Sequence, residues 1–579
     1  MTFDLVIRGG SVVDGTGAPA RTADVAITGD RIEEVGRVDG VARRTIDADG
    51  LLVTPGFVDI HTHYDGQITW DPLLTPTCWH GVTTVVMGNC GVGFAPARRD
   101  SHAWLVGLME GVEDIPGTAL HEGLRWEWET FPEYLDHLSG LDRVMDFGTQ
   151  VPHGAVRAYV MGERGAKNQP ATADDIVAMA RIVKEGVAAG ALGFSMSRTF
   201  AHKAIDGEYV PGTTAEVDEV LGIGLTLGEL GQGVVELAPA GVVGEDLNAP
   251  EREVAWMREL ARRTGRPVTY ALVQHNADPE AWRTMLKLAT QAREEGAPLY
   301  PQVHGRSPML LIGLETRTNP FALAPSWREV AGLPLAERAA RLRGDADLRA
   351  RLVSEVKAAG GGLFARSQTS FDNMYPLGAP KPEYEPDPST SVAAIAARSG
   401  KDPVAVMLDV IAEGDGHHLL NVPLFNFSYG SFDPVKEMLE HPTSVLGLGD
   451  GGAHCNAICD ASMETWMLTH WTRDRAGDHL PVEWVVRKMS RDTAEVYGLL
   501  DRGALAPGLK ADVNLIDYEA LEIEAPRIAH DLPTGAPRFV QGSTGYAATI
   551  VSGQVTIEQG EPTGALPGRL LRGARPDPR

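Results

Sequence analysis

Two histidines separated by one residue follow an apolar run near the start of the chain, in Thr54-Pro-Gly-Phe-Val-Asp-Ile-His-Thr-His63. Residues two apart on a strand project to the same side, so His61 and His63 can hold one metal ion together. Parallel strands commonly carry their functional residues at their carboxyl ends, where a histidine pair has few structural reasons to exist. The spacing therefore predicts a metal centre at the end of this strand.

A cysteine follows a second apolar run, Thr83 to Gly88, in Met-Gly-Asn-Cys-Gly. A bound cation would hold the Cys90 sulfur as a thiolate, and soft sulfur together with imidazole favours zinc over magnesium or calcium. The alternative is a small buried cysteine, which is the role of most free cysteines. We expect Cys90 to bind metal and assign the buried role to the other three, Cys78, Cys455 and Cys459.

The middle of the chain, from about Gly56 to about Leu500, alternates short apolar runs with amphipathic stretches, as repeated βα units do. Eight candidate strands end near Ile60, Gly88, Gln150, Ser195, Ala238, Gln274, Val303 and Gly449. Eight is the strand number of an α/β barrel, so the pattern predicts a (β/α)8 TIM-like barrel. A ninth run, Leu419 to Phe427, competes with the run ending at Val303 for the seventh place, and one of the two must belong to an insertion.

Both ends of the chain consist of short strand-like segments with glycine turns. The first 55 residues contain four, at residues 4–8, 11–14, 24–28 and 31–35, with Gly29-Asp30 as a hairpin loop of type II′. Residues 510–517 and 549–557 repeat the pattern. We expect residues 1–55 and 504–579 to form one small β-sandwich domain beside a barrel at 56–503.

An insertion accounts for part of the length of the barrel region. Residues 305–401 include Pro382-Glu-Tyr-Glu-Pro-Asp-Pro388, which is too rich in proline for a regular element, so we expect a lid or a loop excursion. After Gly564 the chain carries arginines between Pro and Gly, and we expect this tail on the surface.

Several motifs together resemble a known family. They are PGFVDIHTH, GVTTVVMGNCG at 81–91 with Ala95-Pro96, GALGFS at 190–195, a strand ending in His275, and GLGDGGAH at 447–454. They resemble the amidohydrolase superfamily, and within it the D-aminoacylase, or N-acyl-D-amino-acid deacylase, branch. The resemblance covers essentially the whole chain and implies a zinc-dependent hydrolase.

The resemblance also implies roles for individual residues. It makes Cys90 and His275 zinc ligands, and it makes Asp450 a residue that both touches the metal and handles protons. Without it, His275 would be read as a polar loop residue and Asp450, before Gly-Gly, as a turn residue. Their positions at strand ends favour the functional interpretation.

The chain departs from the family pattern at the fifth strand. D-aminoacylases carry a metal histidine there, whereas Gly233-Val-Val-Glu-Leu-Ala-Pro239 has none. Either one metal is held through His61, His63, His275 and Asp450, or Glu236 replaces the missing imidazole as an oxygen ligand. We expect one tightly bound zinc ion and a second that is weak or absent.

Groups that bind the substrate in the family are also replaced. A tyrosine usual after the GFS segment is Phe200, and a lysine usual just after His275 is missing. We therefore look for substrate anchors in Ser197-Arg198-Thr199, in Gln302-Val-His-Gly-Arg306, and at His153. An arginine can hold a carboxylate with two hydrogen bonds, although an exposed arginine is the commoner case.

Composition limits the other functions and the compartment. Lys plus Arg number 52 against 78 Asp plus Glu, so the net charge of 52 − 78 = −26 argues against a general nucleic-acid binder. Four cysteines are too few for disulfide bonds to stabilise a chain of this length, which favours a reducing compartment. No signal peptide and no run of about 20 apolar residues is found, so we expect a cytoplasmic protein without membrane contact. The sequence allows a homo-oligomer.

The predicted function is zinc-dependent hydrolysis of a non-peptide or peptide-like C–N amide bond in a small molecule, of the N-acyl-D-amino-acid deacylase kind. The same machinery could open a cyclic amide, cleave a formamide or an amide natural product, or act as a deaminase. A different class is a non-catalytic, oligomeric amidohydrolase-like scaffold. The presence of His61, His63, His275 and Asp450 speaks against that class, because a scaffold needs none of them.

Overall fold

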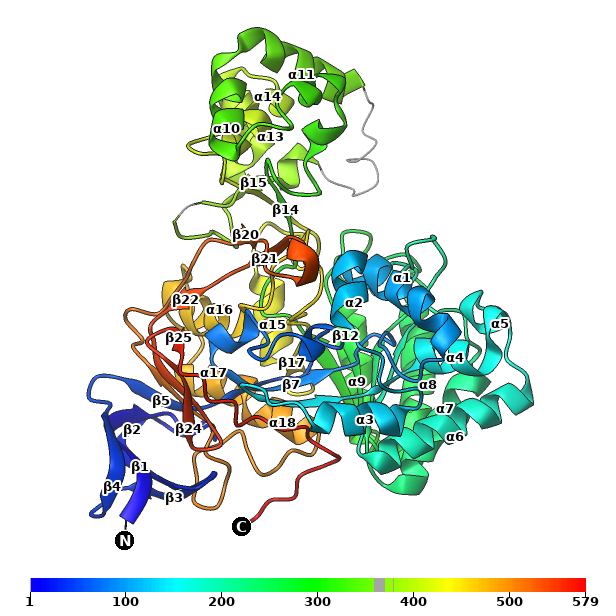
Figure 1. Cartoon of the computed structure of the whole chain (residues 1–579), viewed down its shortest axis with the longest axis vertical. Helices are drawn as coiled ribbons and strands as arrows, with labels where there is room; N and C mark the ends of the chain where they lie inside the picture. Colours follow the sequence, from blue (N-terminus) through cyan, green and yellow to red (C-terminus); the bar gives the residue numbers. More distant parts are fainter. Residues whose placement is uncertain (1, 359–369, 379) are drawn as a thin grey trace.

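The protein has three parts, which are a barrel of strands ringed by helices, a β domain at its side and a helical lobe above the barrel (Figure 1). The structure is a computed structural model and describes residues 2–358, 370–378 and 380–579. The largest apolar cluster lies in the barrel, and the lobe and the β domain have clusters of their own.

The barrel strands are parallel and form two sheets, with the orders β6-β7-β8 and β9-β10-β11-β12-β13-β17. Only Gln150 separates β8 from β9, so the two occupy one position of the barrel, and a parallel bridge between Thr62 and Gly451 joins the last strand to the first. The strands are β6 (Phe57–Asp59), β7 (Val82–Met87), β8 (Asp146–Thr149), β9 (Val151–Pro152), β10 (Gly193–Ser197), β11 (Val234–Ala238), β12 (Val268–Leu272), β13 (Leu299–Val303) and β17 (Val445–Leu446).

The structure decides which apolar run takes the seventh place. The run ending at Val303 is β13, which pairs with β12 and β17 inside the barrel. The competing run contains β16 (Leu420–Pro423), which pairs antiparallel with β14 (Met309–Ile312) and β15 (Tyr375–Pro376) outside the barrel. Both runs are buried, and burial alone gives them the same apolar character.

Amphipathic helices pack around the strands (Figure 1). Thr130 and Thr172 begin two of them with capping boxes, in which side chain and backbone satisfy each other's free polar groups. The helices are α1 (His102–Glu113), α2 (Gly117–Gly123), α3 (Phe131–Ser139), α4 (His153–Met161), α5 (Glu163–Ala166), α6 (Ala173–Ala189), α7 (Val217–Leu230), α8 (Ala249–Thr264), α9 (Ala281–Glu294), α15 (Asp433–Glu440), α16 (Met463–Thr469), α17 (Val482–Met489) and α18 (Arg491–Val496).

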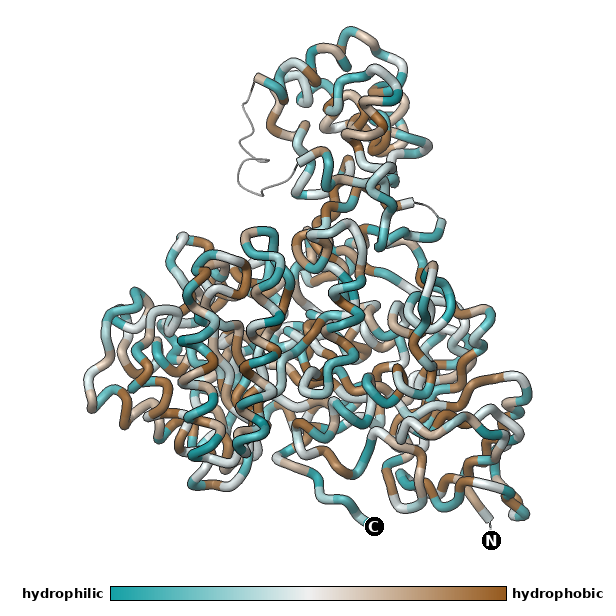
Figure 2. Tube along the Cα trace, turned by 180° about the vertical axis from the view of Figure 1, so that it is seen from behind, coloured by the Kyte–Doolittle hydropathy of each residue, from teal (hydrophilic) through white to brown (hydrophobic). Residues whose placement is uncertain are grey.

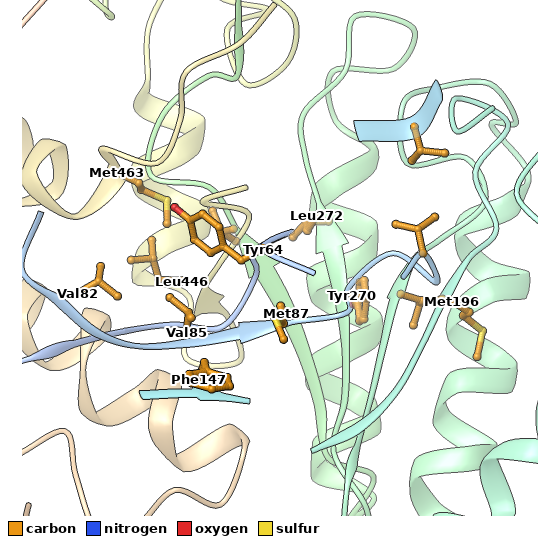
Figure 3. Close-up of a cluster of buried hydrophobic side chains, with 14 of the residues drawn as sticks. Tyr64, Val82, Val85, Met87, Phe147, Met196, Tyr270, Leu272, Leu446 and Met463 are labelled. Atoms are coloured by element: carbon orange, nitrogen blue, oxygen red, sulfur yellow. The ribbon is translucent and has the colours of Figure 1, made fainter. Parts of the chain in front are cut away.

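Apolar side chains from several strands form a buried cluster in the barrel (Figure 3). Val85 and Met87 on β7, Phe147 on β8 and Tyr270 on β12 are fully buried. Close packing of this kind fixes the backbone of the strands, so the residues at their carboxyl ends are presented from a rigid support.

Strands from both ends of the chain form the β domain. Its main sheet has the order β25-β24-β23-β18-β5-β1-β2-β3, with β4 also paired to β1. The strands are β1 (Thr2–Val12), β2 (Arg21–Thr28), β3 (Arg31–Gly36), β4 (Val41–Asp47), β5 (Leu52–Pro55), β18 (Val513–Ile516), β23 (Tyr546–Val551), β24 (Gln554–Glu558) and β25 (Glu561–Pro562). The segment between β18 and β23 forms two further antiparallel strand pairs. In one, β19 (Glu522–Ile523) pairs with β22 (Ser543–Thr544), and in the other, β20 (Arg527–Ala529) pairs with β21 (Arg538–Val540).

The first strand differs from the sequence prediction, and the first hairpin turn agrees with it. The segments expected at 4–8 and 11–14 are one strand, β1, whose register against β2 shifts between Ile7 and Gly10. A bulge lets a strand continue through such a shift, so the glycine pair does not end it. Gly29 has φ +58°, the left-handed conformation that the first residue of a type II′ turn requires.

The insertion is a helical lobe rather than a loop excursion. It contains α10 (Leu335–Gly344), α11 (Ala346–Ala358), α13 (Val392–Ser399) and α14 (Pro403–Ile411), whose apolar residues form one cluster. Figure 2 shows hydrophobic positions along the chain of this lobe. The expected end at Lys401 falls inside the lobe, because α14 and β16 follow it and complete the same core. Most of the proline-rich 382–388 segment has no regular element, as expected. Residues 359–369 and 379 of the predicted insertion lie outside the described residues.

The expectation that the tail lies on the surface is wrong for its middle. Leu570 and Leu571 are buried, and the Leu571 N–H donates to Phe147 O at 2.7 Å. The Arg569 N–H donates to the buried Asp146 carboxylate at 2.9 Å. The backbone hydrogen bonds hold the tail against the amino end of β8, so its arginines extend from an anchored segment.

Among the helices of the described residues, none combines the length and the apolar character that a membrane span requires.

Candidate metal centre

The first and last barrel strands meet at the histidine pair. The Asp450 N–H donates to His61 O at 3.0 Å, and the His63 N–H donates to Gly451 O at 2.7 Å. These bonds fix the backbone where the first and last barrel strands meet, and they bring the Asp450 carboxylate beside the imidazoles of His61 and His63.

Ligand atoms of three side chains form a close group, and a fourth, that of Asp450, lies beside its two histidines. Cys90 Sγ lies 3.5 Å from His61 Nε2, and Asp450 Oδ1 lies 3.4 Å from His61 Nε2 and 3.6 Å from His63 Nε2. Zinc ligands at about 2.0–2.3 Å in a tetrahedron are roughly 3.3–3.6 Å from one another. His61, His63 and Cys90 have ligand atoms that all lie within 4.8 Å of each other. The donor set and the distances fit one zinc ion.

The tautomer of His61 suits a metal ligand. Gln302 Oε1 lies 2.7 Å from His61 Nδ1, so Nδ1 donates to this amide oxygen and Nε2 keeps its lone pair. Burial lowers the pKa of His61 to about 4, against the opposing charge of Asp450. The imidazole is therefore neutral near pH 7.

His63 has a different environment. Its Nδ1 lies 3.3 Å from Oε1 of the buried Glu113, at the end of α1. Burial would lower the pKa of His63, but the carboxylates of Glu113 and Asp450 outweigh it and raise the pKa to about 9. A positive charge is therefore stabilised at this position, and a metal cation can take the place of the proton.

Cys90 and Glu236 also indicate a cation. Burial raises the pKa of the Cys90 thiol well above its usual range, so a thiolate here needs a positive partner. The Cys90 N–H donates to Glu236 Oε2 at 2.8 Å, while Glu236 Oε1 has no hydrogen-bond partner among the described residues and lies 3.7 Å from His61 Nδ1. Burial raises the pKa of Glu236 to about 8, against the Cys90 hydrogen bond and the charge of His63.

The centre opens on the side of Asp450. The Asp450 side chain is 20 % exposed, whereas those of His61 and His63 are 1 % exposed. Burial raises the pKa of Asp450, but the hydrogen bond from His63 and the neighbouring imidazoles of His61 and His454 hold it well below its usual range. Asp450 is thus an ionised carboxylate that solvent can reach.

Two further histidines lie near this opening. His202 interacts electrostatically with His454, His63, Asp450 and His61, and its Nδ1 lies 3.0 Å from Ser197 Oγ. His454 Nε2 lies 3.9 Å from Glu113 Oε2. In the sequence His202 is a single histidine after a predicted strand, whereas His454 is the last residue of the GLGDGGAH motif.

His275 is not brought to this cluster. Its Nδ1 accepts a hydrogen bond from the Asp278 N–H at 3.1 Å and lies against Gly244, where an added Cβ would come within 2.8 Å of it. The preceding Gln274 N–H donates to Asn426 Oδ1 at 2.8 Å. These contacts turn the loop after β12 toward the chain returning from the lobe.

The predicted substrate anchors are engaged with other groups. His153 Nε2 lies 3.0 Å from Glu219, and Arg198 Nε donates to Glu253 at 2.9 Å. Arg306 is fully buried, donates to Asp460 at 3.0 Å and has its guanidinium 3.9 Å from the centre of the Tyr384 ring. Of these predicted anchors, Ser197 is the one with a described contact to a histidine of the opening, His202.

The sequence did not indicate Glu113, and it indicated Gln302 only within a segment of candidate substrate anchors, not as the partner of His61. Glu113 ends a helix and belongs to no motif, and Gln302 lies inside a strand. One signal for Gln302 was present, since it stands next to the predicted strand end at Val303, on the side where functional residues gather.

The family comparison agrees with this geometry. The amidohydrolase family model matches residues 44–557, which is most of the chain. The chain belongs to the amidohydrolase family. The resemblance inferred from the motifs is confirmed.

Two relatives cover nearly the whole of this amidohydrolase. The D-aminoacylase of Alcaligenes xylosoxydans xylosoxydans is 26 % identical over 572 residues, which are 98 % of this chain and 97 % of the relative. The N-acyl-D-glutamate deacylase of the same organism is 28 % identical over 578 residues, with 98 % and 96 % covered.

Solved structures confirm the predicted fold of a barrel with a β domain. A crystal structure of D-aminoacylase has a TM-score of 0.65 at 24 % identity, covering 99 % of this chain and 100 % of the other. The N-acyl-D-glutamate deacylase of Bordetella bronchiseptica, solved with zinc and a phosphonate inhibitor, has a TM-score of 0.63 at 24 % identity and the same coverage.

Proposed function

We propose that this amidohydrolase is a zinc-dependent deacylase that cleaves the amide bond of an N-acyl-D-amino acid or a closely similar compound. The observation that carries the proposal is the buried group of ligand atoms of His61, His63 and Cys90 beside a solvent-accessible, ionised Asp450. Full-length similarity to D-aminoacylase and N-acyl-D-glutamate deacylase supports the substrate class.

His61, His63, Cys90 and Asp450 would hold the zinc ion. When bound, zinc supplies a Lewis acid for the carbonyl oxygen and acidifies water enough to make a nucleophile near neutral pH. A solved D-aminoacylase is described as having a binuclear centre with one-metal activation and second-metal attenuation. The four proposed ligands are enough for one tightly bound ion. A weaker second ion would be attracted to Glu236 Oε1, which has no hydrogen-bond partner among the described residues.

Asp450 moves the proton. Its carboxylate accepts a proton from the attacking water and then delivers it to the departing nitrogen, so it acts first as base and then as acid. Its ionised state suits the first step, and its exposure lets water and substrate reach it. His61 and His63 orient this carboxylate from the buried side.

The substrate carboxylate needs donors near the opening. Because Arg198 and Arg306 are engaged with buried carboxylates, we assign this task to the imidazoles of His202 and His454. Ser197 orients His202 through Nδ1 and leaves Nε2 for the substrate. This replaces the anchors that were expected from the sequence.

The test is metal analysis followed by a substrate panel. The purified chain should contain about one zinc per chain, and it should release a D-amino acid and a carboxylate from N-acyl-D-amino acids, with L-isomers as controls. Ammonia release without a carboxylate would identify a deaminase instead, and ring opening of a cyclic amide without a second product would identify a cyclic amidase. A chain that binds no zinc even after zinc is added would be a scaffold.

A further inference from the structure

The residue pair Glu113-Asp114 connects the metal centre with the helical lobe. α1 ends at Glu113, and Asp114 follows with φ +52°, so the two side chains leave the helix end in different directions. Glu113 is buried and lies 3.3 Å from His63 Nδ1. The Asp114 side chain accepts a hydrogen bond from Arg317 Nη1 at 2.6 Å.

The same pair also holds the loop after β17. The His454 N–H donates to Glu113 O. The Asn456 N–H donates to Asp114 Oδ2 at 3.2 Å, and Asn456 Nδ2 donates to Asp114 O at 3.0 Å. Displacing this helix end would therefore move both the partner of His63 and the loop that carries His454.

Arg317 belongs to the base of the lobe. It follows β14, whose Leu311 N–H donates to Ala457 O at 2.8 Å. Its side chain is 72 % exposed and lines a cavity of about 360 Å³ together with Asp114, Asn456 and Arg538. The pair with Asp114 is therefore open to solvent and to salt.

We propose that Arg317 and Asp114 are positioning residues, which dock the lobe on the loops that hold His63 and His454 and thereby tighten zinc binding. Glu113 is the carboxylate that transmits the effect to His63. The inference rests on the proposed zinc site. It gives the lobe a role in preparing the centre.

The expected sizes follow from the burial of each contact. Buried carboxylate partners of metal-ligating histidines commonly change metal affinity by about 10–100-fold, so Glu113→Gln should weaken zinc binding by that factor. An exposed ion pair contributes less free energy than a buried one, so Arg317→Ala should weaken zinc binding by about 1.4–5-fold at low salt. Because salt screens exposed pairs, the effect of Arg317→Ala should shrink toward none at high ionic strength.

The experiment titrates metal-free full-length chain with zinc in competition with a chromogenic chelator. The matched control is Arg328→Ala, since Arg328 is also an exposed arginine of the lobe and has no ion pair in the structure as described. Arg317→Lys should restore most of the affinity, because it keeps the charge. In a chain that already carries Glu113→Gln, Arg317→Ala should cause no further loss of zinc affinity.

Two results would overturn the inference while leaving the function standing. One is an Arg317→Ala chain that binds zinc as tightly as Arg328→Ala. The other is an equal loss with and without Glu113, which would mean that Arg317 acts independently of His63. If wild-type chain fails to bind zinc, the proposed centre itself is wrong. Circular dichroism of each variant separates loss of affinity from loss of folding, and Glu113→Asp serves if Glu113→Gln does not fold.

Discussion

Asp450→Asn separates proton transfer from metal binding. Asp450 has φ +49°, in the left-handed region that Asp and Asn tolerate better than most residues, so asparagine adds little backbone strain there. The amide keeps an oxygen for the metal and the shape of the side chain. It loses the basic oxygen that accepts the proton.

The size of the effect follows from the arrangement of the ligands. His61, His63 and Cys90 are unchanged, and each of them has a ligand atom in the buried cluster, so zinc should remain bound. Loss of a positioned general base typically costs about 10²–10⁴ in rate. That factor corresponds to about 2.7–5.4 kcal/mol of activation free energy. The fall should appear in kcat.

The assay compares zinc content and steady-state kinetics of wild type and Asp450→Asn on the best substrate of the N-acyl-D-amino-acid panel. Asp478→Asn, at an exposed position of another loop, is the control and should leave turnover unchanged. A zinc-loaded Asp450→Asn enzyme that keeps more than about a tenth of wild-type kcat would refute the role of Asp450 in proton transfer.

Three other predictions concern the metal, the acid stability and the tail. Cys90→Ser replaces soft sulfur by oxygen, so zinc affinity measured by chelator competition should fall by more than the roughly 10–100-fold typical of outer-shell partners. The hydrogen bonds from His153 and Arg157 lower the pKa of Glu219 to about 2 against the effect of burial. Glu219 therefore stabilises the fold above about pH 4.5, by about 3 kcal/mol, and this contribution is lost as the pH falls toward 2. The stability difference between wild type and Glu219→Gln in urea should stay constant above about pH 5 and shrink below it; a difference that grows in acid would contradict the assignment. Leu571→Ala should cost about 2–5 kcal/mol in thermal or urea unfolding, because Leu571 is buried with Val58 and Ile60 at the barrel; an unchanged midpoint would show that the tail is not anchored there.

Hydrophobic patterning predicted the barrel well because its strands are buried runs bounded by turns. The run at Leu419–Phe427 was indistinguishable from a barrel strand, since β16 is equally buried in the base of the lobe. The tail was misjudged because arginine, glycine and proline dominate it, while its anchoring depends on Leu570, Leu571 and backbone hydrogen bonds.

The candidate site was predictable where a ligand type stands in a motif at a strand end, as with His61, His63 and Cys90. Side-chain direction was not predictable, because the contacts of His275 with Asp278 and Gly244 depend on loops distant from β12. Glu113 was missed because nothing in the sequence shows that the end of α1 folds back over His63.

The split β domain has a consequence for synthesis. β5 pairs with β18, and residues that pair across this join, such as Pro55 and Val513, are separated by the entire barrel. At roughly 5–20 residues per second, the ribosome needs about 25–90 s to make the intervening chain. During that time the edge of β5 that will receive β18 has no native partner, and unpaired strand edges recruit other chains. We therefore expect the nascent chain to depend on chaperones until β18 emerges, and slower translation of the barrel region to increase aggregation.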